Sequence, residues 1–220
     1  MRERLLIVAL LVAVTAALPA VELTLTPRAL AEAIDIGQSR LDATRRRFHQ
    51  PYRLAIARPP IDYIDVVTPF RRVALAAETR ARLGDRFFGQ REARATLDAA
   101  PAQIDLLVEL TFHPMNTYVG VPRYDVQLLA AATGTPATLS TAAIERFPRF
   151  GRRTEPPGIT LPYPYALGTT IPLGSEPLTG GTLVVHIDGS EAARQGLYDV
   201  IVSDAGKELG RARLDFRALR

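Results

Sequence analysis

Three runs of alternating hydrophobic and polar residues occupy the end of the chain, at 182–188, 198–203 and 211–216. In each run the apolar side chains stand at every second position, which predicts β-strands with one buried side and one side facing water. Asp204-Ala205-Gly206-Lys207 separates the second run from the third, and its glycine can supply the positive φ of a hairpin turn. This part of the chain therefore predicts a β-sandwich.

The five residues at 196–200, Gly-Leu-Tyr-Asp-Val, resemble the tyrosine corner of immunoglobulin-like sandwiches. The resemblance predicts that Tyr198 is buried and that its hydroxyl bonds to nearby backbone. It concerns the fold alone, because a fold does not specify a function. Our fold prediction is α+β, with an immunoglobulin-like or related antiparallel β-sandwich and N-terminal helices packed against it.

Helical periodicity characterises the N-terminal half of the chain. Thr26-Pro27 is a helix-start signal, and apolar residues then recur at three- and four-residue spacing over 30–48. This stripe needs a partner surface, which is either the β-sandwich or another helix. Thr68-Pro69 repeats the start signal and predicts a second helix that ends at Gly84, and 89–99 predicts a third, shorter helix.

Further alternation predicts strands at 52–57, 61–67, 104–113 and 118–129. In the third of these, Asp105 and Glu109 lie on the side opposite the apolar residues, so we expect them to face outward. After residue 131 the pattern weakens and prolines become frequent, which favours a long crossing loop.

The expected organisation has three parts. Residues 1–20 form a leader, 21–103 a mixed helical part, and 104–220 a β-sandwich part with the Pro-rich crossing at 132–180. We expect the last two parts to form one compact unit, because about 200 residues suit a single domain.

The first 20 residues have the pattern of a secretory signal. Arg2 and Arg4 precede an apolar run at 5–18, which is short for a membrane span. Cleavage after Ala20 would release a periplasmic or extracellular protein. An uncleaved anchor and a buried core helix are the alternatives. The rest of the chain has no run suited to crossing a bilayer, so we expect no membrane span after leader removal.

Composition narrows the function classes. The content of 47% hydrophobic and 23% charged residues indicates a globular protein. The chain has no cysteine, which excludes disulfides, thiolate metal sites and a cysteine nucleophile. A net charge of +4 is too small to indicate a nucleic-acid partner.

Patterns that indicate catalysis or metal binding are weak. Gly-x-Ser-x-Gly does not occur, and His49, His113 and His186 show no tight ligand spacing. If the two strands were neighbours, His113 and His186 could bind zinc together with Glu109, although solvated or hydrogen-bonded histidines are the simpler interpretation. We therefore expect no catalytic residue, no metal and no cofactor.

Arginine and tyrosine gather in the Pro-rich crossing, and both are enriched in binding surfaces. The candidate binding residues are Arg149, Arg152, Arg153, Tyr163 and Tyr165. A loop strapped across the sandwich, with its tyrosines packed inward, is the alternative. We expect an exported non-enzymatic binding or structural protein of the cell envelope, whose partner is another envelope protein or polymer. The alternative is a secreted hydrolase acting on envelope polymers or glycans.

Overall fold

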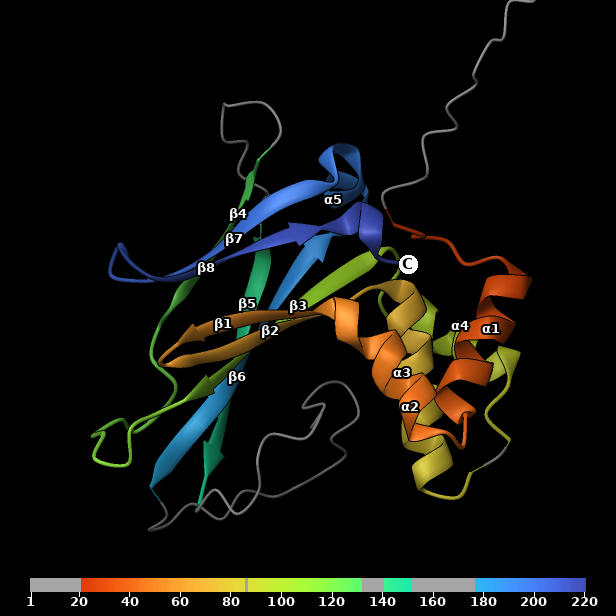
Figure 1. Ribbon diagram of the computed structural model, residues 1–220, viewed down its shortest axis with the longest axis horizontal. Coiled ribbons are helices and arrows are strands. Elements are labelled where there is room, and N and C mark those ends of the chain that lie inside the picture. Colours follow the sequence, from red (N-terminus) through yellow and green to blue (C-terminus); the bar gives the residue numbers. More distant parts are fainter. Residues whose placement is uncertain (1–20, 86, 132–140, 152–176) are drawn as a thin grey trace, which may run out of the picture.

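The computed structural model describes residues 21–85, 87–131, 141–151 and 177–220 (Figure 1). Helices lie on one side of a central five-stranded sheet, and a three-stranded sheet lies on the other side. The leader expected at 1–20 lies outside the described residues. The prediction of an α+β protein with antiparallel sheets is confirmed, whereas an immunoglobulin-like arrangement of the strands is not.

The helical layer follows the start signals of the sequence. Its helices are α1 (Pro27–Gln38), α2 (Asp42–His49), α3 (Pro69–Arg82) and α4 (Gln90–Asp98). The side chains of Thr26 and Thr68 cap α1 and α3 by accepting hydrogen bonds from backbone N–H groups three residues later. Across the described ranges, no helix combines the length and the apolar character needed to cross a membrane.

The first predicted helical stripe is divided in the structure. Leu30, Ile34 and Gly37 are buried on α1, but the helix ends at Ser39, whose ψ of 132° is extended. Leu41, which the stripe would bury, is 68% exposed as a result. The spacing predicts one continuous stripe because residues 38–41, where the helix breaks, contain neither glycine nor proline.

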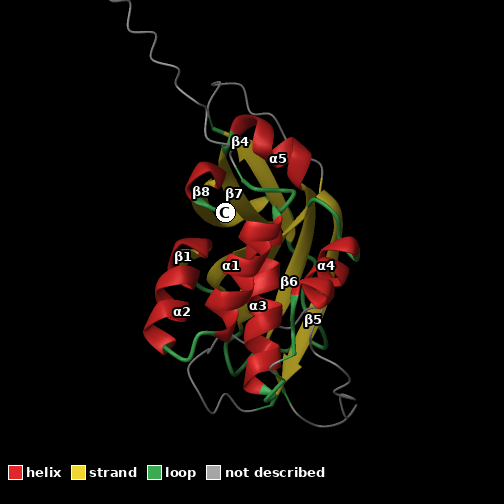
Figure 2. Cartoon of the chain, turned by 90° about the vertical axis from the view of Figure 1, so that its right-hand side faces the viewer, coloured by secondary structure: helices red, strands yellow, loops and turns green. Residues whose placement is uncertain are grey.

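The partner of this stripe is another helix of the same chain (Figure 2). At Gly37, α1 comes so close to α3 that an added Cβ would lie 2.2 Å from the carbonyl oxygen of Ala74. Helix α3 in turn packs on the larger sheet, where Leu75 contacts Leu107 and Val184. The helical layer is therefore attached to the sheet mainly through α3.

Both sheets are antiparallel. The larger sheet has the order β1-β2-β3-β6-β5, with β1 (Arg53–Arg58), β2 (Ile61–Val67), β3 (Gln103–Thr111), β6 (Leu178–Asp188) and β5 (Thr141–Phe150). The smaller sheet has the order β4-β7-β8, with β4 (Asp125–Ala130), β7 (Leu197–Asp204) and β8 (Lys207–Asp215). Single turns of 3₁₀-helix, η1 (Gln50–Tyr52) and η2 (Phe216–Ala218), precede β1 and follow β8.

The three strands predicted at the end of the chain are present, but they do not form one sheet. Strand β6 belongs to the larger sheet, and the helix α5 (Gly189–Gln195) replaces the first predicted turn before β7. The hairpin between β7 and β8 is confirmed, with Gly206 at a φ of 81°. Strand β4 starts at Asp125, so the first half of the predicted strand 118–129 is not a strand.

A strand also occupies part of the expected crossing loop. Strand β5 pairs with β6 at the edge of the larger sheet, and Pro148 stands opposite Gly181. An edge strand tolerates proline because one of its sides has no neighbour that needs the missing N–H. The sequence pattern was weak here because Glu145, Arg149 and Pro148 interrupt the apolar residues.

The two sheets enclose a shared apolar core. Leu106 and Val108 from β3 meet Leu128 from β4 and Val200 from β7 in one cluster of buried side chains. Tyr198 belongs to the same core and is fully buried, and its hydroxyl donates to the carbonyl oxygen of Glu191 at 3.2 Å. The prediction for this tyrosine is confirmed.

Candidate functional site

The side of the larger sheet that faces the helices carries buried carboxylates. Asp65, Asp105 and Glu109 are only 4–5% exposed. The expectation that Asp105 and Glu109 face outward into solvent is wrong, because Asp105 is buried against Arg72 of α3 and Glu109 against Thr182 and Arg149 of the neighbouring strands. The three ion pairs, with N–O distances of 2.9 to 3.0 Å, are Asp65–Arg53, Asp105–Arg72 and Glu109–Arg149.

The histidines considered as metal ligands lie in different surroundings. His186 approaches Asp105 with its Nδ1 at 2.8 Å, and its Nε2 lies 3.7 Å from Glu145. His113 accepts a hydrogen bond from the backbone N–H of Met115 and stays exposed. The part of the chain that the structure describes holds no group of three or more histidines and carboxylates able to bind a metal ion.

His49 occupies a defined tautomer between α2 and α3. Its Nδ1 lies 3.3 Å from Nε of Arg71, which can only donate, so Nδ1 accepts and carries no proton. Its Nε2 lies 3.0 Å from Glu78 Oε2 and therefore donates to this carboxylate. His49 thus joins Arg71 to Glu78 inside the helical layer.

Arg71 continues these contacts into the sheet. It is fully buried, and its Nη1 donates to the carbonyl oxygen of Val66 at 2.7 Å. Its Nη2 lies 3.5 Å from Asp65, within ion-pair distance, but makes no hydrogen bond. Burial lowers the pKa of this guanidinium, although the charge of Asp65 acts in the opposite direction. A row of polar contacts therefore joins Asp65 on β2 to Glu78 on α3.

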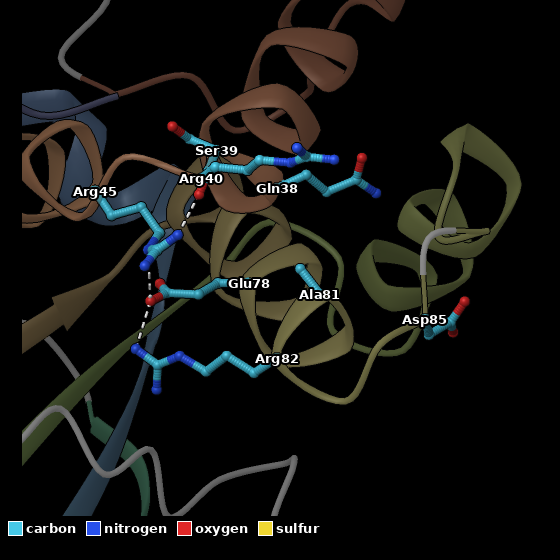
Figure 3. Close-up of a pocket in the computed structure, with 8 residues that line it drawn as sticks. All are labelled: Gln38, Ser39, Arg40, Arg45, Glu78, Ala81, Arg82 and Asp85. Carbon is cyan, nitrogen blue, oxygen red and sulfur yellow. Dashed lines mark hydrogen bonds and ion pairs between the residues drawn. The ribbon is translucent and has the colours of Figure 1, made fainter.

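A pocket opens where this row reaches the surface, at the end of the helical layer (Figure 3). Its volume is about 450 Å³, which lies within the usual range for ligand pockets. We call it the arginine pocket, and it is lined by Gln38, Ser39, Arg40, Arg45, Glu78, Ala81, Arg82 and Asp85.

Glu78 holds two arginines at the wall of the arginine pocket. Its Oε1 lies 2.6 Å from Nη2 of Arg82 and 3.3 Å from Nε of Arg45, while Oε2 accepts from His49. Burial alone would raise the pKa of Glu78, but the hydrogen bond from His49 and the charges of the two arginines together lower it. Glu78 is therefore a charged and fully engaged carboxylate.

The arginines of the pocket differ in how their donors are used. Arg45 is 19% exposed and also contacts the Ser39 carbonyl oxygen and Asp42, so all its nitrogens are engaged. Arg82 is 61% exposed, and its single hydrogen bond to Glu78 leaves its other donors without a protein partner among the described residues. Arg40 is exposed and makes no hydrogen bond or ion pair within the described ranges.

Three large apolar side chains are exposed at positions close in sequence to residues that line the pocket. Leu41 is 68% exposed, Leu83 is 76% exposed and Phe87 is 93% exposed. We call these three residues the apolar rim, because each stands one or two positions from a residue that lines the arginine pocket. Exposed apolar groups of this size are typical of interaction surfaces when they gather beside polar residues.

Of the five predicted binding residues, the structure describes only Arg149. Arg149 is at the end of β5, where its guanidinium donates to Glu109 at 3.0 Å and to the carbonyl oxygen of Leu110 at 2.8 Å. The other four residues, Arg152, Arg153, Tyr163 and Tyr165, lie outside the described residues. Arg149 thus stabilises a buried carboxylate of the sheet, at a different place from the arginine pocket.

Sequence reasoning did not identify the arginine pocket, although part of its signal is visible. Glu78 and Arg82 are four residues apart, a spacing that favours an ion pair on one helix. Arg45 and His49 share the same spacing, but only the packing of α2 against α3 brings them to Glu78. In comparisons with known proteins, no family model, curated protein or solved structure matches the chain.

Proposed function

We propose that the chain is an exported, non-enzymatic binding protein of the cell envelope that docks its partner on the arginine pocket and the apolar rim. The observation that carries this proposal is the 93% exposure of Phe87, which follows by two residues Asp85 in the lining of a pocket that contains three arginines. Aromatic residues and arginine are the most frequent contributors to binding energy at interfaces. The partner is another envelope protein or polymer, and the positively charged lining favours acidic groups on it.

Two features of the sequence are consistent with a location in the cell envelope. The pattern of residues 1–20 favours export, and the chain is free of cysteine. The buried corner at Tyr198 supports, at the level of fold, the comparison with immunoglobulin-like sandwiches, an architecture that many cell-surface domains share.

A secreted hydrolase is the second candidate. The contact between Asp105 and His186 favours it, since a carboxylate that orients an imidazole occurs in hydrolytic sites. However, a general acid or base must reach the substrate, and Asp65, Asp105 and Glu109 are each buried against an arginine. A binding role therefore has the stronger support.

The proposal is tested by cross-linking the tagged full chain in its native envelope. The double substitution Phe87→Ser with Leu83→Ser removes most of the apolar rim, and we expect it to abolish cross-linking to the specific partner. Val119→Ser is the matched control, because Val119 is 98% exposed on a different loop. If the double variant retains the same cross-linked species, or if Val119→Ser loses them equally, this docking surface is wrong.

Export is tested separately by mass spectrometry of the native protein. We expect an N-terminus near Val21, because the leader pattern ends at Ala20. An intact Met1 in a membrane fraction would instead indicate an uncleaved anchor.

A further inference from the structure

We infer that two hydrogen bonds from the side chain of Arg149, which we call the β5 clasp, hold the end of β5 to the sheet and are weakened when acid protonates Glu109. The β5 clasp is independent of the arginine pocket and of the docking function proposed for it. Three features carry the inference: the path of the Arg149 side chain, the weak pairing of the strand around it, and the enclosed position of the Glu109 carboxylate.

The side chain of Arg149 joins two strands that are not neighbours. Strand β6 lies between β5 and β3, and the guanidinium of Arg149 crosses it to reach β3. There Nη1 donates to Glu109 Oε2 at 3.0 Å, and Nη2 donates to the carbonyl oxygen of Leu110 at 2.8 Å. The guanidinium passes over Gly180, where an added Cβ would lie 2.5 Å from Nη2. Glycine at this position of β6 therefore leaves room for the β5 clasp.

The pairing of β5 with β6 is weak around Arg149. The residues opposite Pro148 and Arg149 are Gly181 and Gly180, so these positions lack the cross-strand side-chain pairs that stabilise a sheet. The register of the two strands also shifts between Arg149 and Phe150. Local opening occurs where such contacts are few, and β5 stands at the edge of the described sheet. We therefore expect the attachment of this strand end to depend on the β5 clasp.

The carboxylate of Glu109 is enclosed by the strands on both sides of β3. It is 5% exposed, and its Oε1 accepts a hydrogen bond from the hydroxyl of Thr182 on β6 at 2.7 Å. Burial raises the pKa of Glu109 and the charge of Asp65 raises it further, while Thr182 and Arg149 lower it. Among the described residues, the charged and titratable groups that act on this carboxylate are Arg53 of β1, Tyr63 and Asp65 of β2, and Arg149 of β5.

Protonation of Glu109 and attachment of Arg149 oppose each other. Because the guanidinium lowers the pKa of Glu109, a proton on this carboxylate must in turn weaken the contact with Arg149, since linkage is reciprocal. A neutral carboxyl group accepts an ordinary hydrogen bond, which is roughly half as strong as a charge-assisted one. The side chain of Arg149 is 41% exposed, so water can solvate it when it detaches. The β5 clasp therefore opens as the pH falls through the folded pKa of Glu109.

This local opening differs from acid unfolding. The folded pKa of Glu109 is above the usual value of 4.5, so protonation of Glu109 stabilises the fold as a whole against unfolding. The same proton weakens the contact with Arg149. Acid therefore loosens the end of β5 without Glu109 contributing to global unfolding, and the two events can be measured separately.

The test is amide hydrogen exchange of the full chain, followed by nuclear magnetic resonance between about pH 4 and pH 7 and corrected for the intrinsic exchange rate. The reporter is the N–H of Gly151, which donates to the carbonyl oxygen of Pro177 at 3.1 Å at the end of β5. The N–H of Gly189, bonded to Ala102 at 2.9 Å just beyond the other end of β6, is the internal control. We expect the protection of Gly151 to fall roughly tenfold as Glu109 is protonated, and that of Gly189 to change by less than about twofold.

Substitutions assign the opening to the β5 clasp. Glu109→Gln cannot carry the charge, so Gly151 should be weakly protected at every pH in this variant. Arg149→Gln removes the donor and should give the same result, and we expect it to fold because the side chain is 41% exposed. Glu145→Gln is the matched control, since Glu145 lies on the same strand and is 42% exposed, and it should keep the pH dependence of the unmodified chain.

The inference is overturned if Gly151 keeps its protection in Glu109→Gln and Arg149→Gln, or if acid still reduces this protection in either variant. It is also overturned if Glu145→Gln abolishes the pH dependence. A parallel loss of protection at Gly189 in acid would contradict it as well, because the whole sheet would then be opening and not the end of β5 alone.

Discussion

The two sides of the five-stranded sheet are equally buried but differ in chemistry. Along β3, Leu106 and Val108 face the smaller sheet and are fully buried. Asp105 and Glu109 alternate with them on the opposite side of the strand and are only 4–5% exposed. Alternation thus identifies the two sides of a strand, but it does not show that the polar side is exposed to solvent. Here arginines from α3, β1 and β5 make the polar side a second interior.

The two interiors are stabilised by different physical effects. The apolar side gains free energy roughly in proportion to the apolar area removed from water, about 25 cal/mol per Å². On the polar side the desolvation of each charge offsets much of the attraction, so the net effect of an intact pair is small. Removing one partner is nevertheless costly, because the other charge remains buried alone.

The largest expected effect is on the apolar side. Tyr198→Ala should lower the free energy of unfolding by about 3–5 kcal/mol, as for other large-to-small changes in a core. Tyr198→Phe keeps the ring and should cost only about 1 kcal/mol, the net value of one hydrogen bond. Urea denaturation of both variants measures the difference. Equal midpoints for the two would show that the ring contributes little.

A somewhat smaller effect is expected on the polar side. Asp105→Ala leaves the buried Arg72 without its carboxylate and should cost about 3 kcal/mol in unfolding free energy. Asp125→Ala is the matched control on the exposed side of β4 and should change stability by less than about 0.5 kcal/mol.

A double variant sharpens this result. Because Asp105→Leu with Arg72→Met removes both charges, it should be less destabilising than the sum of its single changes. Simple additivity in the denaturation data would mean that the two charges are not coupled, and the description of this side as a paired interior would be wrong.

The smallest effect appears in the pH dependence, where two glutamates act in opposite directions. The pKa of Glu78 is lowered on folding, so its contribution to stability is present above its usual pKa of 4.5 and is lost as the pH falls through the folded value. Burial raises the pKa of Glu109, although Thr182 and Arg149 lower it. Stability is therefore lost as the pH rises from 4.5 through the folded pKa of Glu109.

Denaturation midpoints between about pH 3 and pH 7 separate these contributions. Glu78→Gln should lower stability on the order of 1 kcal/mol at neutral pH and reduce the loss on acidification. Glu109→Gln should reduce the loss that accompanies the rise in pH. Both assignments are contradicted if the two variants keep the pH profile of the unmodified chain.

Local signals in the sequence predicted much of the backbone. The hydroxyl–proline pairs at Thr26 and Thr68 start helices because a side-chain acceptor and a restricted φ act within a few residues. The turn at Gly206 and the buried Tyr198 were also predicted, since short segments determine them. Features of this kind depend little on the rest of the fold.

Features that depend on distant partners were missed. The end of α1 at Ser39 leaves no mark in the apolar spacing, and β5 is recognised only through its pairing with β6. The arginine pocket depends on α2 meeting α3, which no single segment encodes. The prediction that Asp105 and Glu109 face solvent is wrong because alternation gives no information about what covers a strand.

The pairing of β3 with β6 also determines how the chain can fold during synthesis. Gln103 stands opposite Asp188, so the two central strands are joined only after most of the chain has been made. Until then β3 has β2 beside it but not β6, and the smaller sheet that covers its apolar side still lacks β7 and β8. Contacts between such distant segments slow folding and prolong the exposure of apolar strands. A nascent chain that stops before residue 178 should therefore be the form most in need of a chaperone.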